Sequence, residues 1–97
     1  MPKGYVIGQM DITDPDLYPS YAKHTPASIA EFGGRFIVRG GTAQSIEGDA
    51  PRSRTVVIEF PSVARAHEWY NSPNYQKIVG IRHAAAAGSL YVVEGAD

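Results

Sequence analysis

Strand and helix signals follow one another along the chain in the order strand, helix, strand, strand, helix, strand. Two split β-α-β halves in this order pack as a four-stranded antiparallel sheet with both helices on one face. The right-handed rule for crossover connections leaves few other arrangements. The 97 residues are enough for one small hydrophobic core. We therefore predict a single α+β domain over residues 1–97, a ferredoxin-like βαββαβ sandwich.

Four segments carry the strand signals: residues 4–12, 35–39, 54–60 and 90–94. The first alternates in polarity, and the third is the richest in β-branched side chains. After the second segment, Gly40 and Gly41 predict a bulge or bend, beyond which the strand continues to Ile46. The turn-forming residues 47–51 then join the second and third strands as a hairpin.

The first helical region begins at Asp14 and Pro15, a capping carboxylate followed by a proline that suits the first turn. It ends at Gly33, because glycine readily adopts the left-handed conformation of a helix cap. Pro26 lies inside the region and lacks a backbone donor, which predicts a kink or a broken turn there. The stripe expected to face the sheet recurs at three- and four-residue spacing and comprises Leu17, Tyr21, His24, Ser28, Ile29 and Phe32.

The second helical region begins after Ser62, a favoured capping residue, and runs to about residue 71. Its inward stripe is expected at Val63, Ala66 and Tyr70, with Trp69 at the edge. A second cap and proline, Ser72 and Pro73, restart a short helix that ends near Val79. An irregular connection over residues 80–88 then leads to the last strand.

Side chains alternate across a sheet, so each predicted strand divides between two faces. The set that suits packing under the helices is Val6, Gly8, Met10, Ile12, Phe36, Val38, Val56, Ile58, Phe60, Leu90 and Val92. The other set is Tyr5, Ile7, Gln9, Asp11, Ile37, Arg39, Val57, Glu59, Tyr91 and Val93. This second face is unusually apolar for a sheet that meets water. Because a monomer rarely leaves such a patch uncovered, we predict a homodimer that pairs through this face. The alternative is that a loop or the C-terminal segment covers it.

The charge balance and residue usage exclude several classes of function. The net charge is -1 and the pI about 6.3, so we expect no nucleic-acid partner and no anionic membrane surface. The chain has no cysteine, and its three histidines show no recognised metal-ligand spacing, so we predict no metal and no cofactor. No apolar stretch is long enough for a membrane span or a signal peptide, which favours a cytoplasmic protein.

Several segments together resemble a known family. They are GGRFIVRGG at 33–41, Glu47-Gly48, VIEFPS at 57–62, WYNSPNY at 69–75, and Arg82. In their joint spacing they resemble the domain-of-unknown-function family 1330 (DUF1330) over nearly the whole chain. The resemblance implies a dimeric α+β barrel, with ferredoxin-like protomers whose sheets face each other. Related dimeric α+β barrels include small cofactor-independent monooxygenases, haem-degrading enzymes and isomerases, with the ligand between helices and sheet. A shared fold does not establish a shared function.

His24 is the candidate catalytic residue. Imidazole groups titrate near neutral pH and serve as general acids or bases, and the predicted stripe places His24 one turn from Tyr21. The alternative is a half-buried histidine bonded to a backbone carbonyl or to Tyr21.

Arg39 is a candidate ligand-binding residue on the predicted dimer-facing side of its strand. A guanidinium group there can hold a carboxylate through two parallel hydrogen bonds. The alternative is an ion pair with Glu59 or Asp11, which share its predicted face, and in that case Arg39 meets a neighbour's carboxylate before any ligand.

Tyr21 is a candidate ligand-binding residue beside His24. The aromatic residues Trp69, Tyr70 and Tyr75 are candidates for the lining of a pocket for a planar ligand, and Trp69 is favoured over Tyr70, which falls in the predicted core stripe. The alternative is that they are core residues. Arg82 is a candidate at the edge of the cleft, and the alternative is a solvated pair with His83.

Two classes of function remain open from the sequence. The first is a small-molecule-binding homodimer, which includes a cofactor-independent enzyme of monooxygenase or isomerase type. The second is a non-catalytic regulatory or structural dimerisation module. An enclosed cavity that touches His24 would favour the first, and a cleft filled by Tyr21, Phe32 and Trp69 would favour the second.

Overall fold

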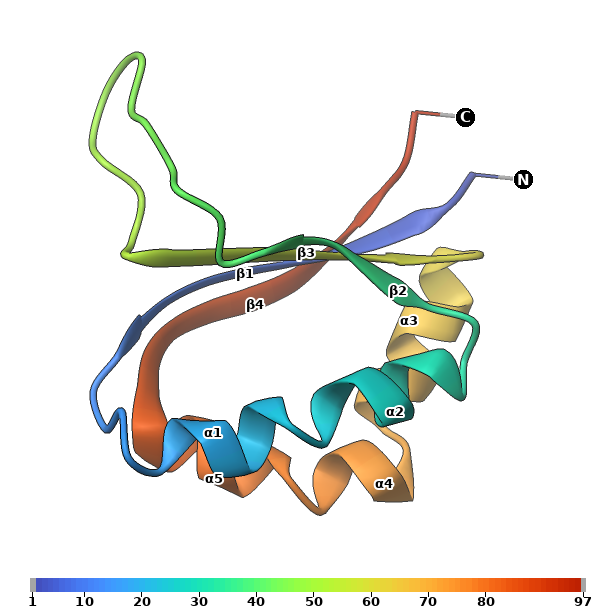
Figure 1. The fold of residues 1–97 in the computed structure, drawn as a ribbon. Helices are drawn as coiled ribbons and strands as arrows, with labels where there is room; N and C mark the ends of the chain where they lie inside the picture. The colour runs from blue at the N-terminus through green and yellow to red at the C-terminus, as the bar shows by residue number, and fades with distance from the viewer. Residues whose placement is uncertain (1, 97) are drawn as a thin grey trace.

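The computed structural model describes residues 2–96 and contains a four-stranded antiparallel sheet with the helices on one side (Figure 1). The strands are β1 (Gly4–Ile12), β2 (Arg35–Arg39), β3 (Arg54–Phe60) and β4 (Ala86–Glu94). The helices are α1 (Tyr18–Ala22), α2 (Thr25–Ala30), α3 (Val63–Tyr70), α4 (Pro73–Gln76) and α5 (Val79–Ala85). The strands lie in the order β2-β3-β1-β4. This arrangement confirms the predicted α+β class and its ferredoxin-like topology.

The first helical region is broken next to Pro26, as its sequence predicts. Helix α1 ends at Ala22, and α2 begins at Thr25 with Pro26 in its first turn. A single helical period therefore does not run through the region. His24 caps α2 and is exposed, so its predicted place on the inward stripe is wrong. Gly33 has a φ of 76° and ends the region in the left-handed conformation.

Two connections differ from the sequence prediction. Residues 42–46 form no strand, and a long loop joins β2 to β3 instead of a short turn. Residues 80–88 are not irregular, because α5 continues through Ala85 and β4 already begins at Ala86. The run of alanines at residues 84–87 has neither the alternation typical of a strand nor the spacing typical of a helix, so its sequence predicts neither element. Pairing of β4 with the whole length of β1, down to Ile12 opposite Ala86, decides where the strand begins.

Helix α3 presents a different face to the sheet than expected. Trp69 is 1% exposed and Tyr70 is only partly buried, so the roles of these two neighbours are reversed. Ser62 caps the helix by accepting a hydrogen bond from the Arg65 backbone N–H at 3.1 Å. The indole of Trp69 lies 5.5 Å from the Phe60 ring and 4.2 Å from the Tyr75 ring, between centroids. This aromatic cluster is the centre of the core.

A β-bulge in β2 changes which side chains lie on each face. Phe36 pairs with Ile58 and Val38 pairs with Val57, so Ile37 is an extra residue without a partner in the register. The alternation therefore reverses after Ile37. Val38 turns away from the helices and is 39% exposed. The prediction that Val38 packs under the helices is wrong. The bulge lies at Ile37, whereas at the glycines the structure has the other predicted feature, a bend, at Gly40.

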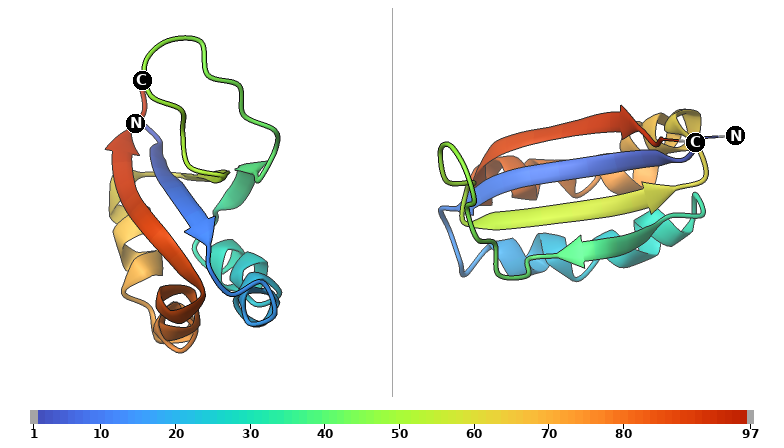
Figure 2. Two further views of the ribbon diagram at one scale, coloured as in Figure 1. Left: turned by 90° about the vertical axis from the view of Figure 1, so that its left-hand side faces the viewer. Right: turned by 90° about the horizontal axis from the view of Figure 1, so that it is seen from above.

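No helix or strand of residues 2–96 covers the face of the sheet opposite the helices, as the view from above shows (Figure 2, right). We call it the open face. Its middle row consists of directly paired apolar side chains from all four strands: Val38, Val57, Ile7 and Tyr91. Tyr91 is 50% exposed and Val93 is 44% exposed. The loop between β2 and β3 projects on this same side, away from the helices (Figure 1).

Candidate functional site

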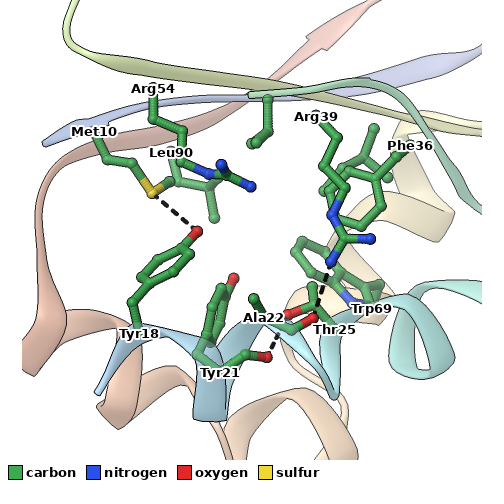
Figure 3. Close-up of a pocket in the computed structure, with 12 residues that line it drawn as sticks. Met10, Tyr18, Tyr21, Ala22, Thr25, Phe36, Arg39, Arg54, Trp69 and Leu90 are labelled. Carbon is green, nitrogen blue, oxygen red and sulfur yellow. Dashed lines mark hydrogen bonds between the residues drawn. The ribbon is translucent and has the colours of Figure 1, made fainter. Parts of the chain in front are cut away.

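The space between the sheet and helices α1 and α2 contains a small cavity that we call the inner cavity (Figure 3). Its lining residues are Met10, Tyr18, Tyr21, Ala22, Thr25, Phe36, Arg39, Arg54, Val56, Ile58, Trp69 and Leu90. Its free volume is about 20 Å³, which is room for a single water molecule. Polar groups from α1, β2 and β3 therefore converge on a small space within otherwise apolar surroundings.

Arg54 enters the inner cavity from the start of β3. It shares the parity of Val56 and Ile58 and so lies on the helix side of the sheet. Its guanidinium carbon lies 5.5 Å from the centre of the Tyr18 ring. Its buried Nε has no hydrogen-bond partner among the described residues. The sequence analysis did not select Arg54, although its position two residues before Val56 was a signal for an inward side chain.

Gly40 makes room for this arginine. A Cβ atom at position 40 would collide with the Arg54 guanidinium, and the φ of Gly40 is 72°, in the left-handed region. Its backbone N–H also donates to the Thr55 carbonyl at 2.9 Å, which holds the loop against β3. Glycine at this position therefore serves both the turn after β2 and the placement of Arg54.

Arg39 lies on the helix side of the sheet, because the bulge at Ile37 reverses the alternation of β2. The prediction that Arg39 lies on the dimer-facing side is therefore wrong. Its Nη2 donates to the carbonyl oxygen of Ala22 at 3.0 Å, at the C-terminal end of α1, and its guanidinium lies 4.5 Å above the Phe36 ring. A cation at a helix C-terminus is favourable, so this contact also links α1 to β2.

The predicted ion-pair partners of Arg39 lie on the other face. Glu59 pairs with Arg35 at 3.3 Å, and Asp11 pairs with Arg52 at 2.8 Å. Neither carboxylate lines the inner cavity. The alternative of an ion pair between Arg39 and one of these residues is therefore wrong.

Three tyrosines supply hydroxyl groups to the same region. The hydroxyls of Tyr21 and Tyr75 lie 2.9 Å apart in a buried hydrogen bond. Burial and then the neighbouring Tyr75 raise the pKa of Tyr21 far above its ordinary value, and burial raises the pKa of Tyr75 as well. Both therefore stay protonated at neutral pH and act as hydrogen-bond donors and not as bases. Among the described residues the Tyr18 hydroxyl donates only to the Met10 Sδ at 3.6 Å, a weak acceptor.

Trp69 separates the inner cavity from the far side of the core. Its indole N–H donates to the Ser28 hydroxyl at 3.1 Å, and that hydroxyl donates to the Thr25 carbonyl at 2.8 Å. The polar edge of Trp69 is thus satisfied within the protein, and its ring offers a flat apolar wall.

Arg82 lies on α5, near Tyr21 and Tyr75, and is only 7% exposed. Its Nε is buried without a hydrogen-bond partner among residues 2–96, and its positive charge lowers the pKa of Tyr75 against the larger effect of burial. The predicted solvated pair with His83 is wrong, because Arg82 is buried. Arg82 lines a second hollow of about 350 Å³, which we call the β4 groove. The residues that line it are Val6, Ala66, His67, Trp69, Tyr70, Arg82, Leu90, Tyr91 and Val92.

His24 lies apart from these groups. It lines a third, open hollow of about 380 Å³ between α2 and α4, with Ala27, Ser28, Asn74, Lys77 and Ile78.

The structure brings three of the predicted site residues, Tyr21, Arg39 and Trp69, together at the inner cavity. Tyr75 contacts Tyr21, and Arg82 lies at the β4 groove. Arg54 and Tyr18 complete the inner cavity and were missed.

Within residues 2–96, no three His, Asp or Glu side chains lie close enough together to hold a metal ion. None of the helices described by the structure is both long and apolar enough to cross a bilayer.

A four-stranded sheet of this order, covered by helices on one face and open on the other, is the architecture of ferredoxin-like α+β proteins. Residues 3–96 match the family described as "Domain of unknown function (DUF1330)", and the chain belongs to this family. The resemblance inferred from the sequence motifs is confirmed. No curated protein matches the chain.

The solved structures that match the chain include two proteins of similar fold. The RPA0582 protein of unknown function from Rhodopseudomonas palustris is 19% identical with a TM-score of 0.78, over 99% of this chain and 84% of that one. SnoaB, a cofactor-independent oxygenase from Streptomyces nogalater, is 10% identical with a TM-score of 0.65, over 100% of this chain and 96% of that one. At these identities the likeness extends to the fold alone.

Proposed function

We propose that this chain is a small-molecule-binding homodimer whose ligand site is the inner cavity. The observation that carries the proposal is the convergence of Arg54, Arg39 and the Tyr18 hydroxyl on one apolar cavity, with a guanidinium nitrogen of Arg54 left without a partner. A few convergent polar groups in an apolar, concave setting are the usual composition of a ligand site. Buried polar atoms without partners are rare in folded proteins unless they serve a function.

The same groups suit an enzyme that needs no cofactor. Arginine and protonated tyrosine donors around a water-poor cavity stabilise negative charge that develops on an oxygen atom of a substrate. SnoaB, described as a cofactor-independent oxygenase, shares the fold and supports this class of activity by analogy. We assign no role in this site to His24, which is exposed in another hollow.

A thermal-shift screen of the purified protein against metabolites, haem and flavins tests the proposal. A ligand at a hundred times its Kd adds about 2.7 kcal/mol to the free energy of unfolding. A bulkier side chain at Ala22, which lines the inner cavity, should abolish the shift caused by any compound found in this way. The variant is Ala22→Leu, and the matched control is Ala27→Leu on the exposed side of α2.

We expect the control to bind as the unmodified protein does. Circular dichroism of Ala22→Leu checks that the variant folds. Stabilisation by a compound that survives in folded Ala22→Leu would place the binding site elsewhere and contradict the proposal.

The second candidate function is a non-catalytic dimerisation module, and two observations favour it. Tyr21 and Trp69 fill most of the space between helices and sheet, and the cavity between them is small. The apolar row on the open face provides the pairing surface in both candidates. A monomeric mass at micromolar concentration in solution would contradict the homodimer in either case.

A further inference from the structure

We propose that the inner cavity binds a negatively charged oxygen group of its ligand, a carboxylate or an enolate, between Arg54 and Arg39. This inference rests on the proposed function, because it names the ligand class of the same site. Three observations carry it. Two guanidinium groups line one cavity, no carboxylate of the described residues faces them, and one of their nitrogens has no hydrogen-bond partner.

The acidic side chains that form ion pairs within residues 2–96 do so away from this cavity. Their pairs are Asp11 with Arg52, Glu59 with Lys3 and Arg35, and Glu68 with Arg65. The first two pairs lie on the open face, so the sheet separates them from Arg39 and Arg54. Two like charges that share a cavity without a counter-ion raise the free energy of the empty site. An anion bound between them removes that repulsion.

The donors of the site are free to turn towards an anion. A guanidinium has five N–H donors, and the one hydrogen bond found for Arg39 among the described residues is that to Ala22. Arg54 stacks on the Tyr18 ring and leaves its Nε unpaired. Among residues 2–96 the Tyr18 hydroxyl donates only to a thioether sulfur, so rotation of the hydroxyl to donate to an anionic oxygen replaces a weak hydrogen bond with a charge-assisted one.

The size of the cavity limits what it holds. About 20 Å³ accommodates a group of the size of a carboxylate only with small shifts of the lining side chains, and not a whole ligand. Arg39 lines the cavity and is itself exposed, so the cavity opens to solvent on its side. The rest of the ligand therefore extends outward past Arg39. The cavity holds the anionic end.

Side-chain Nε–Hε resonances of arginine in 1H–15N spectra of the intact protein test the inference. Two matched probes are titrated separately, sodium acetate and its neutral analogue acetamide. We expect acetate to shift the resonances of Arg54 and Arg39 in a saturable way, and acetamide to leave them in place. Arg54→Met should weaken acetate binding, read at Arg39, by at least ~10-fold, because a charge-assisted hydrogen bond is lost. Arg65→Met, which removes an arginine paired on the surface of α3, should leave acetate binding unchanged.

The outcomes separate this inference from the proposed function. Equal saturable shifts with acetamide and acetate would overturn the anionic class and leave a small-molecule site. If neither probe shifts Arg54, Arg39 or the Trp69 indole resonance, the inference fails, and the thermal-shift screen decides the proposed function separately. Shifts that never saturate, and that are the same at Arg65 as at Arg54, report ionic strength alone and also overturn the inference. Unfolding in urea checks that Arg54→Met is folded, and Arg39→Met gives a second, independent loss of binding if the first variant does not fold.

Discussion

The two faces of the sheet differ in whether their charged side chains form ion pairs. On the helix side, Arg39 and Arg54 line a cavity without a carboxylate from the described residues. On the open face, Asp11 and Glu59 are bound by basic or hydroxyl groups, and the apolar row lies between them beside the polar pair Gln9 and Thr55. The same strands form both faces. The alternation of side chains, reversed in β2 by the bulge at Ile37, places Arg39 and Arg54 on one face and the two carboxylates on the other. The helix side has the composition of a ligand site, and the open face has that of a protein interface.

The largest expected effect is on the helix side, where the core lies. Trp69→Ala should lower the free energy of unfolding by about 3–5 kcal/mol, because a large buried ring leaves a cavity. Urea denaturation measures the loss. Ile46→Ala, at a loop position that is 96% exposed, is the control and should stay within about 0.5 kcal/mol. Equal losses in the two variants would mean that Trp69 does not lie in the core.

The open face should respond through assembly instead of through folding. Tyr91→Lys places an unpaired ammonium group at the β4 end of the apolar row of each protomer, at a cost of several kcal/mol if that row is buried by pairing. We expect the dimer Kd to rise by at least about 100-fold while the protomer stays folded, as measured by analytical ultracentrifugation and circular dichroism. Gln76→Lys, at an exposed position on the helix side, should not change the Kd. A dimer equally stable with Lys at position 91 would show that the open face is not the interface.

Glycine substitutions in the loop after β2 separate backbone strain from the placement of Arg54. Gly40→Ala should lower the free energy of unfolding by about 1–2 kcal/mol, because φ is positive there, and it should also weaken ligand binding by displacing the Arg54 guanidinium. Gly48→Ala has the same backbone cost with open space around it, and Gly41→Ala has neither cost. Urea unfolding and the acetate titration measure the two effects. Binding that is lost equally in the variants at 40 and 48 would contradict a positioning role for Gly40.

The smallest expected effect is the pH dependence of stability, which differs between the faces. Hydrogen bonds from Ser53 hold the pKa of Asp11 below its ordinary value, and the pKa of Glu59 is lowered as well, because Arg35 and Lys3 outweigh its partial desolvation. A carboxylate with a lower pKa in the folded state stabilises the fold fully above its unfolded-state value, about 4, and loses this contribution as the pH falls further. The double variant Asp11→Asn with Glu59→Gln should lose less of its free energy of unfolding between pH 5 and pH 3 than the unmodified protein, as measured by urea denaturation at each pH.

The helix side should instead lose stability in alkali. The raised pKa values of Tyr21 and Tyr75 mean that both hydroxyls stabilise the fold below the unfolded-state value, about 10, and lose that contribution as the pH rises above it. Tyr21→Phe should lose less of its free energy of unfolding above pH 10 than the unmodified protein, and its loss between pH 5 and pH 3 should be unchanged, as measured by urea denaturation. If Tyr21→Phe no longer lost stability between pH 5 and pH 3, that result would contradict this division between the faces.

Local patterns in the sequence predicted the elements and most of the two faces. The limits of β1 and β3, the start of β2, the break at Pro26 and the capping serines agree with the structure, because propensity, proline chemistry and capping act over a few neighbouring residues. The family followed from the joint spacing of motifs. The candidate site was predicted only in part: Tyr21, Arg39 and Trp69 do meet at the inner cavity, although Arg39 was expected on the wrong face and Trp69 at an edge.

What the sequence by itself determined is the order of elements and an apolar open face, since both follow from periodicity along the chain. Only the tertiary structure decided which charged side chains face the cavity. One extra residue in β2, Ile37, shifts the register against β3 and moves Arg39 from the open face to the helix side, and no local pattern records that shift. Pairing between strands determines the side of a residue, and a single bulge reverses it for every residue that follows in the strand.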